Sequence, residues 1–222
     1  MEYVINNNME SICQKLSNTF IAKSFYLAGG TGLALQINHR SSDDLDFIYE
    51  NDNGIDSESI ITTMEEQLDK KVRVQLKESN QLDLLVEGSK LTFLSYPFPL
   101  MFYLKQGENV SDSLKGIKIA SVKEIALMKA YSMGRRSSYK DYIDMYYILK
   151  NEGIDLGFII ENAKKKYEKT ITGSFSEKLF REQLVYTDDV TDKEEAMSKV
   201  FDRNLTQEAI EEFLKEMVMR QI

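Results

Sequence analysis

The sequence predicts an α+β fold, in which a mixed β-sheet core flanked by helices is followed by a helical C-terminal half. The first observation is that five short apolar stretches typical of strands precede residue 100. The second is that beyond Pro97 and Pro99, the only prolines, apolar residues recur mostly at helical spacing. The third is size, because 222 residues, 42% of them hydrophobic, are enough to bury a substantial core.

The elements predicted before Pro97 alternate between helices and strands. A short apolar strand stops at Gly29 and Gly30, which favour a tight turn, and Ser57 is a candidate cap for the helix that follows it. Helices are predicted at residues 9–23, 33–37 and 57–68. Strands are predicted at residues 25–28, 45–49, 72–76, 82–86 and 91–96.

The elements predicted after Pro99 are helices. Ser121 and Glu124 have the spacing of a capping box at the start of the first of them, and Gly134 is expected to end it. The predicted helices span residues 121–133, 140–150, 156–167, 176–185, 192–201 and 206–219.

Composition excludes several classes of protein and of site. No apolar stretch approaches the roughly 20 residues that a transmembrane helix needs, and the N-terminal residues lack a secretory signal. Cys13 and His39 are the only cysteine and histidine, which excludes an intramolecular disulfide and a metal site built on either residue type. We therefore expect a cytoplasmic bacterial protein that does not associate with a membrane.

Two carboxylates carry the strongest chemical signal. Asp44 and Asp46 are two residues apart on a predicted strand, so their side chains project to the same face. Side-by-side carboxylates repel, and a divalent cation relieves the repulsion; oxygen ligands favour Mg²⁺ or Mn²⁺. Gly29 and Gly30, just before a predicted helix, allow backbone N–H groups to approach phosphate oxygens. Together these features indicate a nucleoside triphosphate site, although acidic residues at the edge of a strand also occur without any such role.

Several segments carry a resemblance to a known family. They are YLAGGTGLALQ at 26–36, HRSSDDLDF at 39–47, FLSYPFP at 93–99, Met128-Lys129, Arg136, and KDYIDMY at 140–146. In this order the segments resemble the AbiEii/AbiGii toxin-type nucleotidyltransferases, which belong to the polymerase-β-like nucleotidyltransferase superfamily.

The resemblance implies a fold and a function. It implies a nucleotidyltransferase-like α/β core at residues 1–100 and a mostly helical region at residues 101–222 that completes the active-site cleft. The activity would be metal-dependent transfer of a nucleoside monophosphate from an NTP to an acceptor, such as tRNA or another RNA, with release of pyrophosphate. The protein would be the toxin of a toxin–antitoxin or phage-defence system, with an antitoxin as partner.

Two alternatives stay open. The same site would also suit nucleotidylation of a small molecule or of a protein. A degenerate member of the family would bind nucleotide or antitoxin without turnover.

The resemblance also assigns roles to residues. Asp44 and Asp46 would be the metal ligands and, with Lys129 and Asp144, the catalytic residues. The expected nucleotide-binding residues are Gly29, Gly30, Thr31, Arg40, Lys129, Arg136, Lys140 and Asp141. Thr31 stands where the superfamily usually has serine, and it retains the hydroxyl.

One catalytic carboxylate of the superfamily has no counterpart. Thr92 stands near the expected position of this third acid, on the strand at 91–96. Asp83 on the preceding strand is the nearest substitute, and Asp144 is the other. We therefore expect activity that is low relative to related enzymes.

Charge is unevenly distributed along a chain whose net charge is −8. Between Lys115 and Lys140 there are seven basic residues and one acidic residue, which suits an RNA phosphate track or, equally, solvated helix faces. Lys129 in this run is expected to face the aspartate pair. The alternatives are that Lys129 covers core surface or points to solvent, and that Arg136 merely pairs with Asp141.

Overall fold

The chain divides into two units, each with its own core. The computed structural model describes residues 3–51, 53–133, 135–136, 138–168 and 174–220. The units are Met1–Ser121 and Val122–Ile222. Residues 101–121, which the sequence analysis placed in the helical region, lie in the first unit and contribute two strands to its sheet. No helix in the described part of the chain has the length and apolar character needed to cross a bilayer.

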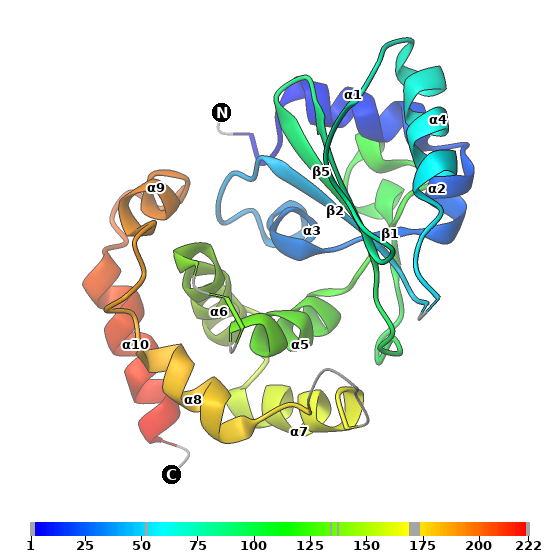
Figure 1. Ribbon diagram of the computed structural model, residues 1–222. Helices are drawn as coiled ribbons and strands as arrows, with labels where there is room; N and C mark the ends of the chain where they lie inside the picture. Colours follow the sequence, from blue (N-terminus) through cyan, green and yellow to red (C-terminus); the bar gives the residue numbers. More distant parts are fainter. Residues whose placement is uncertain (1–2, 52, 134, 137, 169–173, 221–222) are drawn as a thin grey trace. The chain divides into compact units, whose positions relative to one another are not determined.

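A mixed sheet forms the centre of the first unit (Figure 1). Within the described residues it has seven strands in the order β3-β4-β5-β2-β1-β7-β6. β2 pairs in parallel with β5, and β1 with β7, whereas the other neighbours are antiparallel. The strands are β1 (Tyr26–Leu27), β2 (Asp44–Tyr49), β3 (Arg73–Lys77), β4 (Gln81–Val86), β5 (Ser89–Ser95), β6 (Lys105–Gln106) and β7 (Lys118–Ile119).

The helices of the first unit differ from the predicted ones in three details. The helix predicted at 33–37 begins at Gly29, so both glycines belong to its first turn. The segment predicted as one helix at 9–23 is two helices, because Thr19 has extended backbone angles and its hydroxyl donates to the Leu16 carbonyl at 2.7 Å. The cap of α4 is Asp56 rather than Ser57, and its carboxylate accepts from the Ser59 N–H. The helices are α1 (Asn7–Leu16), α2 (Phe20–Ser24), α3 (Gly29–Ile37), α4 (Ser57–Leu68) and two 3-10 turns, Gly107–Asn109 and Asp112–Leu114.

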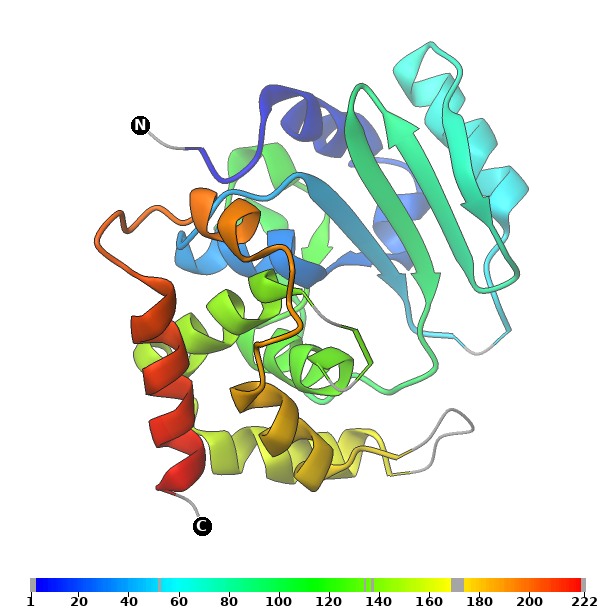
Figure 2. The ribbon, with the colours of Figure 1, turned by 60° about the vertical axis from the view of Figure 1, so that its left-hand side comes forward.

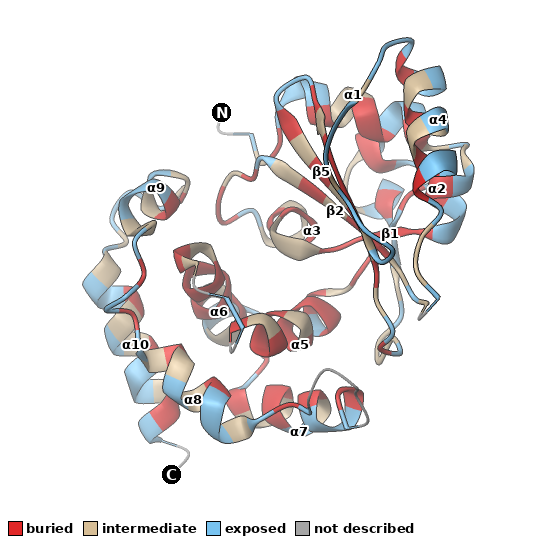
Figure 3. Ribbon diagram, in the orientation of Figure 1, coloured by how far each residue is buried: buried red, intermediate tan, exposed pale blue. Residues whose placement is uncertain are grey.

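The core of the first unit lies on one face of the sheet. Leu45 and Phe47 of β2 are almost fully buried and belong to the same apolar cluster as the inward residues of α1 and α4. Figures 1 and 3 show α1 and α4 on this side of β2 and α3 on the other side. Because successive side chains of a strand alternate, Asp44 and Asp46 project toward the side on which α3 begins.

The second unit is helical, as predicted. In Figure 2, α8 and α10 lie side by side, and α7 packs against α5. The α5 helix ends at Met133, and Gly134, its expected terminator, lies outside the described residues. The helices are α5 (Val122–Met133), α6 (Tyr139–Asn151), α7 (Leu156–Lys166), α8 (Glu177–Val185), α9 (Lys193–Ser198) and α10 (Gln207–Met219).

Candidate functional site

Asp44 and Asp46 lie on the face of β2 that is turned away from the apolar core. Both are half-buried, whereas Leu45 and Phe47 between and beside them are no more than 1% exposed. The alternation confirms that the two carboxylates share one face. Their oxygens are hard ligands of the kind that Mg²⁺ and Mn²⁺ prefer, and the half-open setting leaves coordination positions for water or substrate.

The start of α3 lies directly against this pair. Gly29 has a φ of +62°, and a Cβ atom added there would stand 1.9 Å from Asp46 Oδ2. The Ala28 N–H donates to the Asp46 carbonyl at 2.9 Å, which fixes the turn to β2. The N-cap residue of α3 is Ala28, which makes no side-chain hydrogen bond to the helix, and N–H groups in the first turn of a helix have no partner within it. This position suits a phosphate group bound together with a cation.

Two further predicted residues surround the same turn. The guanidinium of Arg40 is buried, donates from Nη1 to the Ser41 carbonyl at 3.0 Å, and fills the space where Gly30 would carry a Cβ. The buried Thr31 hydroxyl lies 2.7 Å from the Ser42 hydroxyl oxygen and also hydrogen-bonds to the Asp44 carbonyl. Thr31 therefore anchors the first residue of β2, which is a structural task that the sequence analysis did not anticipate.

The sheet register places Thr92 beside Asp46. On the other side of Thr92, across the antiparallel pair of β5 and β4, lies Asp83. Because neighbouring strands are 4.7–4.9 Å apart, the Cα atoms of Asp46 and Asp83 are separated by about 10 Å. Asp83 is thus on the correct face but one strand further away than a third acid at Thr92 would be.

Lys90 is a residue that the sequence analysis missed. It is the β5 partner of Asp44 in the register, and its ammonium lies 2.8 Å from Asp83 Oδ2. The hydrogen bond with Asp83 raises the pKa of Lys90 against the effect of burial, and the charges of Asp44 and Asp46 raise it further. Strand register between β2 and β5 is not visible in a single sequence, so no signal in the sequence could have identified this lysine.

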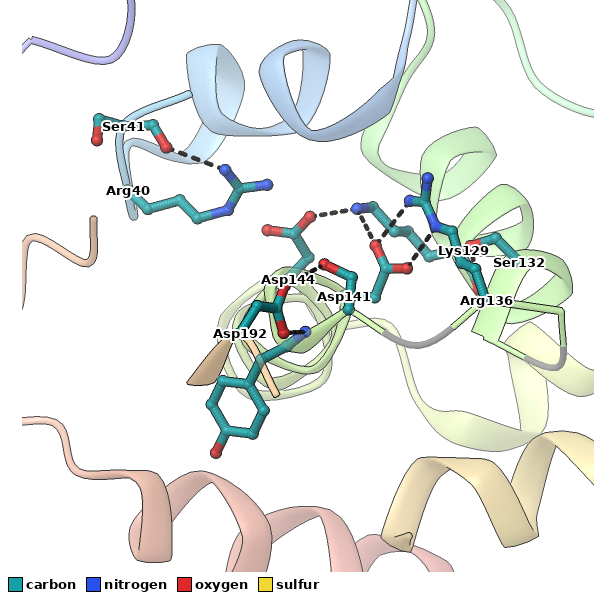
Figure 4. A network of polar contacts seen from close by, with 10 residues as sticks. Arg40, Ser41, Lys129, Ser132, Arg136, Asp141, Asp144 and Asp192 are labelled. Carbon is teal, nitrogen blue, oxygen red and sulfur yellow. Dashed lines mark hydrogen bonds and ion pairs between the residues drawn. The ribbon is translucent and has the colours of Figure 1, made fainter. Parts of the chain in front are cut away.

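A buried ionic cluster occupies the second unit (Figure 4). Lys129 of α5 is 4% exposed, and its ammonium lies 2.6 Å from Asp141 Oδ1 and 2.5 Å from Asp144 Oδ2 of α6. Asp141 and Asp144 are three residues apart, so they share one face of α6. Burial would raise the pKa of Asp141, but the charges of Lys129 and Arg136 outweigh burial and lower it.

The contacts of Arg136, Lys129 and Lys140 show whether these side chains pair with carboxylates or point to solvent. Arg136 does pair with Asp141, donating from Nε at 2.9 Å and from Nη2 at 3.0 Å. Lys129 points into the buried cluster and not to solvent. Lys140 forms an ion pair with Glu195 at 3.9 Å. Three of the seven basic residues in the run are therefore engaged by carboxylates, so the run is not a uniformly available track of charge.

Comparison with known proteins identifies the family. The family described as "Nucleotidyl transferase AbiEii toxin, Type IV TA system" matches residues 11–219. The chain belongs to this family. The resemblance predicted from short segments is thereby confirmed, and the protein is a member of a family of nucleotidyltransferase toxins.

Similar proteins extend the comparison beyond the AbiEii family assignment. An uncharacterized protein of Aquifex aeolicus is 36% identical over 207 residues, which cover 92% of this chain and 91% of that protein. MenT4, a nucleotidyltransferase toxin from Mycobacterium tuberculosis, matches with a TM-score of 0.63 and 16% identity over 95% of this chain and 80% of its own. JHP933 from Helicobacter pylori matches with a TM-score of 0.53 and 16% identity over 96% of this chain and 88% of its own. These structures share the fold.

The residues present fit a divalent cation of the kind that nucleotidyltransferases generally use. Asp44 and Asp46 supply two oxygen ligands on one face. Among the described residues there is no group of three or more aspartate, glutamate, histidine or cysteine side chains with the arrangement of a metal site. A divalent cation held by these two carboxylates would take its other ligands from water or from phosphate oxygens.

Proposed function

We propose that this protein transfers a nucleoside monophosphate from an NTP to an RNA acceptor in a metal-dependent reaction, and that it does so as the toxin partner of an antitoxin. The observation that carries the proposal is the position of Asp44 and Asp46, side by side on β2, with the Asp46 carboxylate against the Gly29 turn. Cation ligands and phosphate-binding N–H groups are thus adjacent, and an NTP with its divalent ion needs both.

Each group at β2 has a definable task. Asp44 and Asp46 would hold Mg²⁺ or Mn²⁺, and the N–H groups at the start of α3 would bind phosphate oxygens. A bound ion would supply charge neutralisation for the triphosphate, whose α-phosphate would be attacked by an acceptor hydroxyl with pyrophosphate as the leaving group. Arg40 would support the turn from behind, since it packs on Gly30.

The proposed task of the second unit is to present Lys129 to the triphosphate. The resemblance assigns Lys129 to the triphosphate, Arg136, Lys140 and Asp141 to the nucleotide, and Asp144 to catalysis. Because the Lys129 ammonium lies between two carboxylates, Asp141 and Asp144 would act by holding it in position. A lysine in this role provides a compact charge for the leaving pyrophosphate.

Transfer of label from NTPs tests the proposal. The protein is incubated with each [α-³²P]NTP, Mg²⁺, and total RNA or total protein, and the products are separated on denaturing gels. We expect Mg²⁺-dependent labelling of RNA of tRNA size by the wild type. Asp46→Asn should abolish the labelling, whereas Asp43→Asn, a matched change at an exposed neighbouring aspartate, should retain it.

Other outcomes would replace parts of the proposal. Label found only in the protein fraction would make a protein the acceptor. Binding of NTP without label in any fraction would favour the non-catalytic alternative, which the threonine at position 92 supports because a third acid is expected there. Toxicity is tested separately, since expression of the wild type should arrest growth and expression of Asp46→Asn should not.

A further inference from the structure

Lys90 occupies an unusual place beside the aspartate pair. It lies on β5 directly opposite Asp44 in the parallel register, and register partners of neighbouring strands project from the same face of a sheet. Its ammonium contacts Asp83, and its side chain is 43% exposed. A cation in this position is adjacent to the region where the triphosphate is proposed to bind.

The contacts around Lys90 keep it charged and in place. Asp83 Oδ2 lies 2.8 Å from the ammonium, and Asp83 is itself held by the Gln81 amide, which donates to Oδ1 at 2.9 Å. Burial would raise the pKa of Asp83, but the hydrogen bonds from Lys90 and Gln81 outweigh burial and lower it. The pair is therefore ionised at neutral pH, as the raised pKa of Lys90 also indicates.

The strand residues around the pair include three acidic side chains and one basic one. These are Asp44, Asp46 and Asp83 against Lys90, so the formal charge of these four is −2 before a nucleotide and its ion bind. A second divalent ion would need a further carboxylate ligand close to the pair, and Thr92 stands in that place. Within the described part of the chain, Asp83 does not join the pair in a group of three acidic ligands.

We propose that this chain binds one divalent ion per nucleotide and that the ammonium of Lys90 contacts the triphosphate. Lys90 would thus take the place that a second divalent ion has in a two-ion site. The inference rests on the proposed function, because it takes Asp44 and Asp46 as the nucleotide and metal site. Lys90 would be a substrate-binding residue, and Asp83 would be the residue that positions it.

Manganese binding tests the inference without relying on turnover. The wild type is titrated with Mn²⁺ in the presence of each of the α,β-methylene analogues of ATP, GTP, CTP and UTP, and bound Mn²⁺ is counted by electron paramagnetic resonance. We expect one Mn²⁺ per bound analogue with the six-line spectrum of an isolated ion. Two ions at the spacing of about 3.5–4 Å typical of two-metal sites would instead give a spin-coupled spectrum.

Variants of Lys90 test its contact with the triphosphate. Lys90→Met should raise the Kd of the Mn²⁺-bound analogue about tenfold or more, because a charge-assisted hydrogen bond is lost. Lys90→Arg should restore most of the affinity. The matched control is Lys77→Met, since Lys77 on β3 is 44% exposed and is likewise ion-paired, with Glu58. The double variant Lys90→Met/Thr92→Asp should bind two spin-coupled ions.

The outcomes separate this inference from the proposed function. A spin-coupled pair of ions in the wild type, or an unchanged Kd in Lys90→Met, would overturn the role of Lys90 and leave the nucleotide site intact. If the wild type bound none of the four analogues in the presence of Mn²⁺, the proposed function would fail, and the inference with it.

Discussion

Among single residues, Gly29 explains most clearly why this turn has its sequence. Its φ of +62° lies in the left-handed region, and the Asp46 carboxylate occupies the space that a Cβ would need. Glycine is the residue that satisfies both conditions without strain. The backbone can therefore approach the Asp46 carboxylate closely, which is what the proposed phosphate-binding turn beside a metal ligand requires.

Gly29→Ala should destabilise the first unit by about 2–4 kcal/mol, because a strained φ and a steric clash act together. The measurement is chemical denaturation monitored by circular dichroism. Gly88→Ala is the control, since Gly88 has a φ of +85° but nothing within 4 Å of its added Cβ, and it should cost only about 1 kcal/mol. An equal loss of unfolding free energy in the two variants would show that the Asp46 side chain moves away without strain and that its close contact with Gly29 does not affect stability.

Cys13 reports on the packing of the first unit. It is fully buried on α1, and burial, together with the charge of Glu10, raises its pKa to about 12. At pH 8 the folded protein should therefore react with a thiol reagent far more slowly than the denatured protein. The reagent cannot reach the buried sulfur, and the sulfur is protonated rather than present as the reactive thiolate. The test is the rate of thiol labelling with and without denaturant. A native rate close to the denatured rate would contradict the burial of α1 against the sheet.

Among the elements, the pairing of α5 with α6 depends on a buried cluster of charges. Lys129 lies between Asp141 and Asp144, and all three side chains are at most 5% exposed. Charges that are removed from water are tolerated only while they remain paired. The resemblance assigned Lys129 to the nucleotide and to catalysis, and its buried ion pairs give it a structural role as well.

Lys129→Met should destabilise the second unit by about 3–5 kcal/mol, because it leaves two buried carboxylates without their shared cation. Thermal or chemical denaturation measures the change. Lys165→Met on α7 removes an exposed ion pair with Glu161 and should cause no measurable change. A Lys129→Met protein as stable as the wild type would show that Asp141 and Asp144 do not need the lysine to remain folded.

The same cluster predicts a dependence of stability on pH. Since the folded pKa of Asp141 lies below the ordinary value, its ionisation stabilises the fold above about pH 4 and ceases to do so as the pH falls through the folded pKa. In Lys129→Met only Arg136 still opposes the effect of burial, so the pKa of Asp141 rises and this carboxylate takes up a proton more readily. The deficit of this variant relative to the wild type should therefore shrink from pH 7 toward pH 4. A deficit that stays constant over this range would contradict the electrostatic account.

At the scale of the whole molecule, much of the secondary structure could be predicted from the sequence. The strands around Leu45 and Leu91 and all six helices after Pro99 are confirmed, because their periodicity or their flanking turns are distinct. The two-residue strands β6 and β7 were missed, since two residues show no alternation. These strands place residues 101–121 in the first unit.

The site could be predicted only in part, because some of its contacts join residues that are far apart in the sequence. The shared face of Asp44 and Asp46 follows from a spacing of two within one strand. The position of Lys90 depends on the register between β2 and β5, and the contact of Lys129 with Asp144 depends on the packing of two helices. Such long-range contacts are set by tertiary structure, and no local pattern in one sequence encodes them.

The fate of the two ends of the triphosphate tests the central claim most directly. The protein and the RNA fraction are incubated with Mg²⁺ and the same nucleotide labelled at either the α- or the γ-phosphate. A nucleotidyltransferase should attach the α-label to the acceptor and release the γ-label as pyrophosphate, and both events should be absent in Asp46→Asn. Attachment of the γ-label, or attachment of the α-label at an undiminished rate in Asp46→Asn, would contradict nucleotide transfer at the aspartate pair.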